Sequence, residues 1–164
     1  MRSLVVPSLL LLSVAPASAE PGLATAEVRL AYGLAAGGGS GRATVRGSPL
    51  VLTAAAALAV RDQPRISAHA GLLVETLDRT GAGGEAGLTL TPRDDVRLRA
   101  GVVAVVTPYT IWGAAAGGGS CRPLAGSRIC VDLTANVLVG GTDLPSGSAV
   151  LQLLVGLGVI FDAS

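Results

Sequence analysis

The stretch VRLRAGVVAVV, residues 96–106, decides the fold class of this chain. Side chains of a β-strand point alternately to its two faces, whereas those of a helix repeat about every 3.6 residues. The stretch follows the two-residue period and therefore predicts a strand with one apolar face and one face that carries charge and glycine. The apolar set is Val96, Leu98, Ala100, Val102 and Ala104, and the opposite set is Arg97, Arg99, Gly101 and Val103.

Similar short segments recur on both sides of this stretch, separated by clusters of Gly, Pro, Asp and Ser, which is typical of strands joined by turns. At roughly 3.3 Å per residue and a tilt near 40°, ten residues cover about 25 Å, the height of an outer-membrane apolar band. The Ala-rich middle of residues 49–60 also fits a helix. The Gly-rich residues 37–41 and 117–119 lack the Lys-Ser/Thr of a phosphate-binding loop and are expected to be flexible loops. The eight expected strands cover residues 26–35, 49–60, 65–77, 85–91, 96–106, 110–116, 131–137 and 149–161.

The distribution of charge favours a membrane barrel over a soluble one. Half of the residues are hydrophobic and 14% are charged, against roughly 25% in typical soluble domains. A soluble barrel keeps apolar side chains inside and charges in water, but here the charged positions share a face with glycines, which suit a crowded lumen. The fold class is therefore predicted to be all-β, an antiparallel up-and-down barrel of about eight strands. The glycines in phase with the polar set are Gly33, Gly71, Gly87, Gly101, Gly156 and Gly158.

The N-terminal segment has the pattern of a secretory signal peptide. Arg2 precedes an apolar run over residues 4–14, and Ala17-Ser18-Ala19 provides a small-x-small cleavage site. The expected domains are a signal peptide over residues 1–19 and a single barrel domain over residues 20–164. Removing Arg2 takes the basic residues from 12 to 11, against 11 acids, so the mature chain is formally neutral and has no basic excess to suggest nucleic acid.

The face opposite the apolar one is expected to form a polar network in the lumen. Acids and arginines should pair across strands there, because an unpaired charge in a narrow interior is costly. His69 shares this face with Ser67, but no hydrolase motif surrounds the two residues, so a satisfied interior histidine is favoured over a catalytic one. No catalytic, cofactor or metal site is predicted. The expected network consists of Glu27, Arg29, His69, Glu75, Glu85, Arg97, Arg99, Asp132 and Asn136.

Cys121 and Cys130 are the only cysteines. In an exported chain they are expected to form a disulfide, because the compartment is oxidising. The expected role is to make rigid a loop that lies between two strands on the periplasmic side.

The last expected strand carries a family resemblance. Residues 151–161 alternate toward an aromatic side chain near the C-terminus, which resembles the terminal β-signal of bacterial outer-membrane barrels, with Leu157, Val159 and Phe161 as its key positions. The chain thus resembles the small eight-stranded outer-membrane barrels of the OmpA/OmpX type. This resemblance implies outer-membrane lipid and the barrel-assembly machinery as partners, and a structural or surface-interaction role without enzymatic activity.

Three alternatives remain open at this stage, because aromatic residues make up only 2% of the chain and membrane barrels usually carry more. Residues 100–116 could belong to a transmembrane helix. The chain could instead be an exported soluble β-domain, periplasmic or secreted, that binds a small apolar ligand. A barrel enzyme that acts on lipid comes third, and loss of activity in His69→Ala would identify it.

Overall fold

A computed structural model describes residues 24–39, 42–46, 49–60, 63–76 and 80–162, and for residues 39, 42–46 and 63–64 it describes the backbone alone. The signal peptide expected over residues 1–19 lies outside these ranges. The described chain forms nine strands: β1 (Ala24–Gly39), β2 (Arg42–Arg46), β3 (Leu50–Val60), β4 (Gln63–Thr76), β5 (Thr80–Arg93), β6 (Val96–Thr107), β7 (Ile111–Leu124), β8 (Ser127–Gly140) and β9 (Ala149–Asp162).

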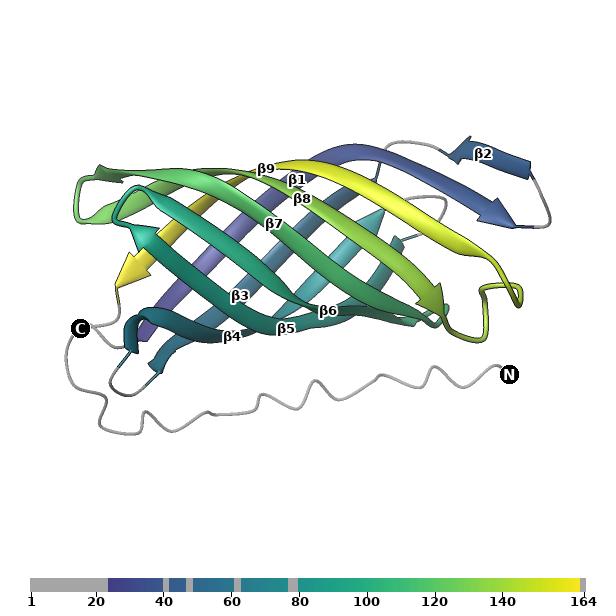
Figure 1. Cartoon of the computed structure of the whole chain (residues 1–164), viewed down its shortest axis with the longest axis horizontal. Helices are drawn as coiled ribbons and strands as arrows, with labels where there is room; N and C mark the ends of the chain where they lie inside the picture. Colours follow the sequence, from purple (N-terminus) through teal and green to yellow (C-terminus); the bar gives the residue numbers. More distant parts are fainter. Residues whose placement is uncertain (1–23, 40–41, 47–48, 61–62, 77–79, 163–164) are drawn as a thin grey trace, which may run out of the picture.

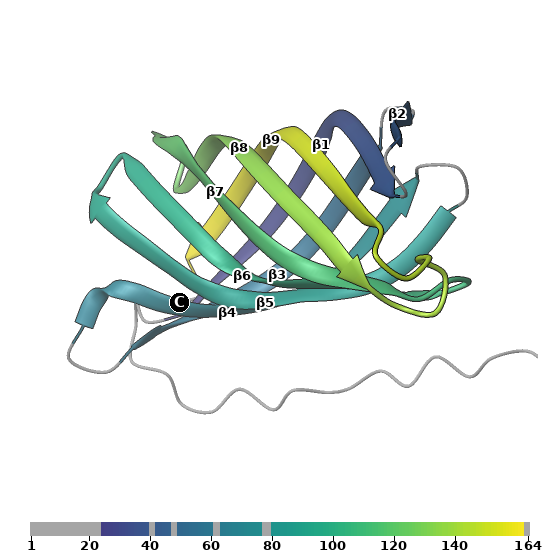
Figure 2. The same ribbon diagram turned by 45° about the vertical axis from the view of Figure 1, so that its right-hand side comes forward.

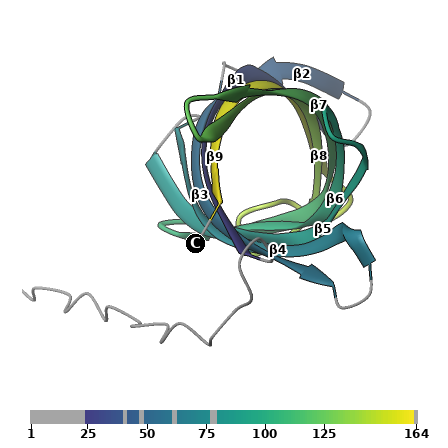
Figure 3. The same cartoon turned by 90° about the vertical axis from the view of Figure 1, so that its left-hand side faces the viewer.

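The strands close into a barrel (Figures 1 and 3). From β3 to β9 each strand pairs antiparallel with the next, and β1 pairs with both β3 and β9, which joins the two edges of the sheet. β2 pairs with residues 35–39 of β1, and β3 pairs with residues 24–32 on the same edge. The nine strands therefore make an eight-stranded antiparallel barrel, in which β2 and β3 share one position.

The barrel has two different ends (Figure 2). At the end where β1 begins and β9 finishes, here called the terminal end, hairpin β5–β6 turns through residues 94–95 and hairpin β7–β8 through residues 125–126. Ala125 and Gly126 have φ of 46° and 81°, the left-handed conformation of a tight two-residue hairpin turn. At the opposite end, called the loop end, residues 108–110 and 141–148 form longer connections.

The alternation predicted from the sequence is present in the barrel. The predicted apolar set of each strand faces outward, and the charged positions of the strand interiors face inward. Leu72 on β4 is 76% exposed and Leu133 on β8 is 60% exposed, whereas the neighbouring Leu73 and Asp132 are each 3% exposed. The exterior is thus a continuous apolar surface, and the charges of the strand interiors lie inside.

Several predicted boundaries were wrong, mostly where glycine is abundant. Residues 37–39 belong to β1 and residues 117–119 lie within β7, although both stretches were predicted to be loops, and residues 42–46 form β2, where no strand was predicted. β7 consequently runs to Leu124 rather than ending at Ala116, and β5 begins at Thr80 rather than after Gly84. A glycine has no side chain to show which face it occupies, so a run of glycines hides the two-residue period.

The helical alternatives were also wrong. Residues 49–60 and 100–116 lie mainly in β3, β6 and β7. Among the residues that the structure describes, no helix is long and apolar enough to cross a membrane.

Candidate functional site in the barrel lumen

Six charged side chains form a belt across the lumen in its terminal half. Glu27 and Arg29 come from β1, Glu85 from β5, Arg97 and Arg99 from β6, and Asp132 from β8. They face inward because each occupies the same phase of its strand, and barrel closure brings β1 beside β9 and thus near β8. This set of three arginines and three acids, here called the charge belt, is formally neutral.

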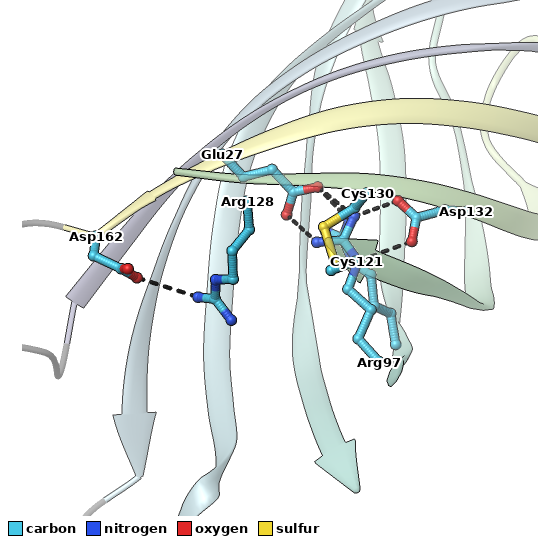
Figure 4. The surroundings of a disulfide bond; sticks show 8 residues. Glu27, Arg97, Cys121, Arg128, Cys130, Asp132 and Asp162 are labelled. Atoms are coloured by element: carbon cyan, nitrogen blue, oxygen red, sulfur yellow. Dashed lines mark hydrogen bonds and ion pairs between the residues drawn. A yellow bond between two sulfur atoms is a disulfide. The ribbon is translucent and has the colours of Figure 1, made fainter. Parts of the chain in front are cut away.

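Arg97 is the centre of the charge belt (Figure 4). Its Nη1 and Nη2 donate to the two carboxylate oxygens of Glu27 at 3.0 and 2.7 Å, and its Nε donates to Asp132 Oδ1 at 2.8 Å. Nη2 also donates to the other oxygen of Asp132. Arg97 is 4% exposed and Asp132 is 3% exposed, so both charges are compensated inside the protein and not by solvent.

The other two arginines complete the charge belt through Glu85. Arg29 Nη2 and Arg99 Nη2 donate to the two oxygens of Glu85 at 2.9 and 2.8 Å. Arg99 Nη1 also donates to Glu27 at 3.3 Å, and Arg29 Nη1 donates to the hydroxyl of Thr134 at 3.2 Å. Each acid therefore has at least one arginine partner, which is the condition for burying so many charges without a large desolvation penalty.

The glycines of β9 make room for the charge belt. A Cβ at Gly158 would lie 3.1 Å from Glu27 Oε1, and one at Gly156 would lie 3.4 Å from Arg29 Cγ. The long side chains of β1 thus occupy the space that side chains on β9 would otherwise fill. This explains why these two glycines share a phase with the polar set.

The loop half of the lumen contains an apolar cluster. Its buried side chains pack together, and Tyr109 and Leu144 of the loop-end connections pack against them. The lumen was predicted to be polar throughout, so this cluster, here called the apolar plug, was not predicted. It consists of Ala31, Val51, Leu73, Val103, Val105, Ile111, Leu138 and Leu154.

Two residues of the expected network lie at the loop end, apart from the charge belt. Asn136 Nδ2 donates to Gln152 Oε1, and Gln152 Nε2 donates to Glu75 Oε1, both at 2.9 Å. Gln152, which is 1% exposed, joins Asn136 to Glu75 and was not among the predicted network residues. It could have been predicted to face inward from its position on β9, which is in phase with Gly156 and Gly158.

Below the charge belt, toward the terminal end, the lumen opens into a cavity of about 510 Å³, here called the vestibule. Glu27, Arg97 and His69 line it, and Arg65, Asp94, Arg128 and Asp162 are among its other charged residues. His69 Nδ1 lies 3.1 Å from the hydroxyl of Thr89. Ser67 lines the same cavity and has no side-chain bond to His69 among the described residues.

The disulfide is present but does not lie in a loop. Cys121 of β7 and Cys130 of β8 are directly opposite one another, with a Cα–Cα distance of 4.0 Å, and both point into the lumen (Figure 4). The prediction of the bond is confirmed, whereas its expected location was wrong. The bond links two adjacent strands next to the charge belt at the terminal end.

Leu157 and Phe161 lie on the outward face of β9 and are about half exposed, and Val159 shares their phase. Their expected recognition by an assembly machinery stays a prediction. Within the described ranges, no group of three or more His, Cys, Asp or Glu side chains could hold a metal ion.

An antiparallel eight-stranded barrel with an apolar exterior and a charged interior defines the class of this protein by fold. No protein-family model matches the chain, and no curated protein matches it in sequence. Among solved structures, it is similar to a designed transmembrane β-barrel, with a TM-score of 0.50 and 12% identity over 88% of this chain and 98% of the other.

The chain is also similar to Ail, the attachment invasion locus protein of Yersinia pestis. The structure of Ail alone gives a TM-score of 0.51 at 11% identity, over 85% of this chain and 99% of Ail. The structure of Ail in complex with the heparin analogue sucrose octasulfate gives 0.50 at 12% identity, with the same two shares. At these identities the similarity establishes the fold.

Proposed function

We propose that this chain is an integral outer-membrane β-barrel without enzymatic activity, with a structural or surface-interaction role in the cell envelope. The observation that carries the proposal is the inverted polarity of the barrel. Large apolar side chains, such as Leu72 and Leu133, cover the exterior of the barrel, while the charge belt is buried. In water such a surface would be an aggregation hazard, whereas in lipid it is the favourable arrangement.

Barrel closure supports the same proposal. Because β1 pairs with β9 over residues 25–38, the sheet leaves no open edge along the barrel wall at those positions. Unpaired backbone groups in lipid cost several kcal/mol each, so a closed barrel is the only sheet that can span a membrane.

The structural role is supported by the contents of the lumen. The charge belt and the apolar plug both cross it, and a second cavity, beside Arg29 and Arg99, has a volume of only about 20 Å³. That is room for about one water molecule. The barrel is therefore expected to be closed to ions and solutes.

The alternative of a soluble domain that binds an apolar ligand requires apolar side chains around an open cavity. The vestibule is instead lined by charged and hydroxyl groups together with small side chains. The candidate reactive groups of a lipid-acting enzyme, Ser67 and His69, line the vestibule, and no side-chain hydrogen bond joins them among the described residues.

The experiment that tests the membrane proposal is electrophoresis of isolated outer-membrane fractions with and without boiling, combined with carbonate extraction. A mobility shift on boiling together with resistance to carbonate is expected. A protein that carbonate releases, with no mobility shift, would contradict the proposal and favour an exported soluble domain.

A further inference from the structure

We propose that the vestibule is a binding site for a small, neutral, polyhydroxylated solute of the size of a monosaccharide. The inference goes beyond the proposed function and rests on the barrel fold and the lining of the vestibule. The cavity of about 510 Å³ falls within the range of roughly 300–1,000 Å³ that is usual for small-molecule sites.

The vestibule is made by side-chain size and not by a break in the barrel. The three inward positions of β3 in this half are Ala55, Ala57 and Ala59, and all three line the cavity. At the loop end of the same strand, Val51 belongs to the apolar plug. The larger side chain of Val51 thus fills the lumen at the loop end, whereas the three alanines leave space open at the terminal end.

The formal charges of the vestibule lining sum to zero, although Arg65 and Asp94 form no ion pair among the described residues and Arg65 donates to the carbonyl oxygen of Pro92. Its lining contains three arginines and three acids, so no net charge selects an ion. Glu27 is bound by Arg97 at the floor, and Arg128 donates to Asp162 at 3.2 Å near the opening. A charged solute would have to compete with these bonds, whereas a neutral solute leaves them intact.

Hydroxyl groups and alanines lie next to one another in register. Ser67 pairs with Ala59 on one side and with Thr89 on the other, and His69 pairs with Ala57. Neither Ser67 nor Thr91 has a side-chain hydrogen bond among the described residues, so both hydroxyls can donate to and accept from a solute. A polar row beside a row of methyl groups matches a sugar or polyol, which presents hydroxyl edges and C–H faces.

Within the part of the chain that the structure describes, the vestibule opens toward the terminal end. The vestibule lies at the terminal end, and the charge belt and the apolar plug separate it from the loop end. A solute bound there would enter and leave by the same opening, so the site suits retention and not passage.

The test is an NMR titration of the full chain, folded in phosphocholine micelles that contain no sugar headgroup, with glucose as the neutral probe and glucose 6-phosphate as its charged counterpart. Saturable shifts are expected with glucose at backbone amides of residues 55–59, 65–69 and 89–91. Glucose 6-phosphate is expected to bind at least several-fold more weakly.

Two variants locate the site. Ala57→Leu reduces the vestibule, and Ser67→Ala combined with Thr91→Ala removes two hydroxyls. Each is expected to weaken glucose binding about tenfold or more. The leucine takes space from the solute, and each of the two lost hydrogen bonds contributes a factor of a few. The matched control is Ala68→Leu on the outward face of β4, for which unchanged binding is expected.

The proposal is overturned if glucose gives no saturable shift, if glucose 6-phosphate binds as tightly as glucose, or if the hydroxyl variant binds like the unmodified chain. A mobility shift on boiling verifies that each variant is folded. Failure of glucose binding in a folded, heat-modifiable barrel would leave the membrane proposal intact.

Discussion

The two halves of the lumen share one backbone architecture but have different contents. In the loop half, Leu73, Leu138 and Leu154 belong to the apolar plug, and the hydrogen-bonded chain of Glu75, Gln152 and Asn136 lies in the same half. In the terminal half, the charge belt crosses the lumen and the vestibule lies open below it. The difference shows that the strand pattern determines the barrel, whereas side-chain size at the inward positions determines whether a level of it is packed, charged or open.

Arg97→Ala is expected to have the largest effect, because it leaves Glu27 and Asp132 without their main partner. Breaking a buried pair costs about 3–5 kcal/mol of unfolding free energy. Urea unfolding of the barrel in micelles measures it. The control is Arg128→Ala, whose ion pair with Asp162 is partly exposed and contributes about 0–1 kcal/mol. Equal losses in the two variants would show that the charge belt is not a buried unit.

Leu154→Ala tests the apolar plug. Removing this buried side chain, which is 2% exposed, is expected to cost about 3 kcal/mol through lost contacts and the cavity left behind. Its neighbour Leu153 faces outward and is 48% exposed, so Leu153→Ala should cost markedly less in the same assay. A larger loss of stability in Leu153→Ala than in Leu154→Ala would contradict the assignment of Leu154 to the inside and Leu153 to the outside of the barrel.

Replacing both Cys121 and Cys130 by Ser tests the link between β7 and β8. The chain-entropy model for so short a closure gives about 2.5 kcal/mol of stability. Reduction of the unmodified chain should lower its unfolding midpoint by the same amount as the double substitution. Full stability after both treatments would show that the bond contributes nothing to the barrel.

Gly158→Ala is the smallest of these changes. Its Cβ would lie 3.1 Å from Glu27 Oε1, so the carboxylate must shift, and a loss of about 1 kcal/mol is expected. Gly38→Ala, where nothing lies within 4 Å of the added Cβ, should change stability by less than about 0.5 kcal/mol. Equal stability of the two variants would contradict the explanation that the β9 glycines leave space for the long side chains of β1.

The sequence predicted the barrel and the facing of its strands because alternation is a local property that side chains display directly. It predicted poorly where glycine is dense, as at residues 37–39 and 117–119, which lie within strands. The cysteines were expected in a loop for the same reason, since the glycines before Cys121 concealed the continuation of β7.

The contents of the lumen were less predictable, because they depend on which strands meet across the barrel. Alternation identified the inward positions of the charge belt, but the partners of Arg97 come from β1 and β8, 70 and 35 residues away along the chain. The apolar plug was not predicted because its residues have apolar neighbours that face outward. Leu73 and Leu154 each follow an outward leucine and precede an outward valine, so no difference in polarity along the sequence identifies them as inward.

The most direct test of the account uses the single tryptophan, Trp112, which faces outward on β7 and is 53% exposed. Its fluorescence is measured in vesicles of brominated and unbrominated phosphatidylcholine, and with aqueous acrylamide as a second quencher. An outward face in contact with lipid predicts blue-shifted emission, strong quenching by brominated lipid and weak quenching by acrylamide. Emission at the wavelength of a solvated indole, quenched by acrylamide and unaffected by brominated lipid, would contradict the proposal that this surface lies in a membrane.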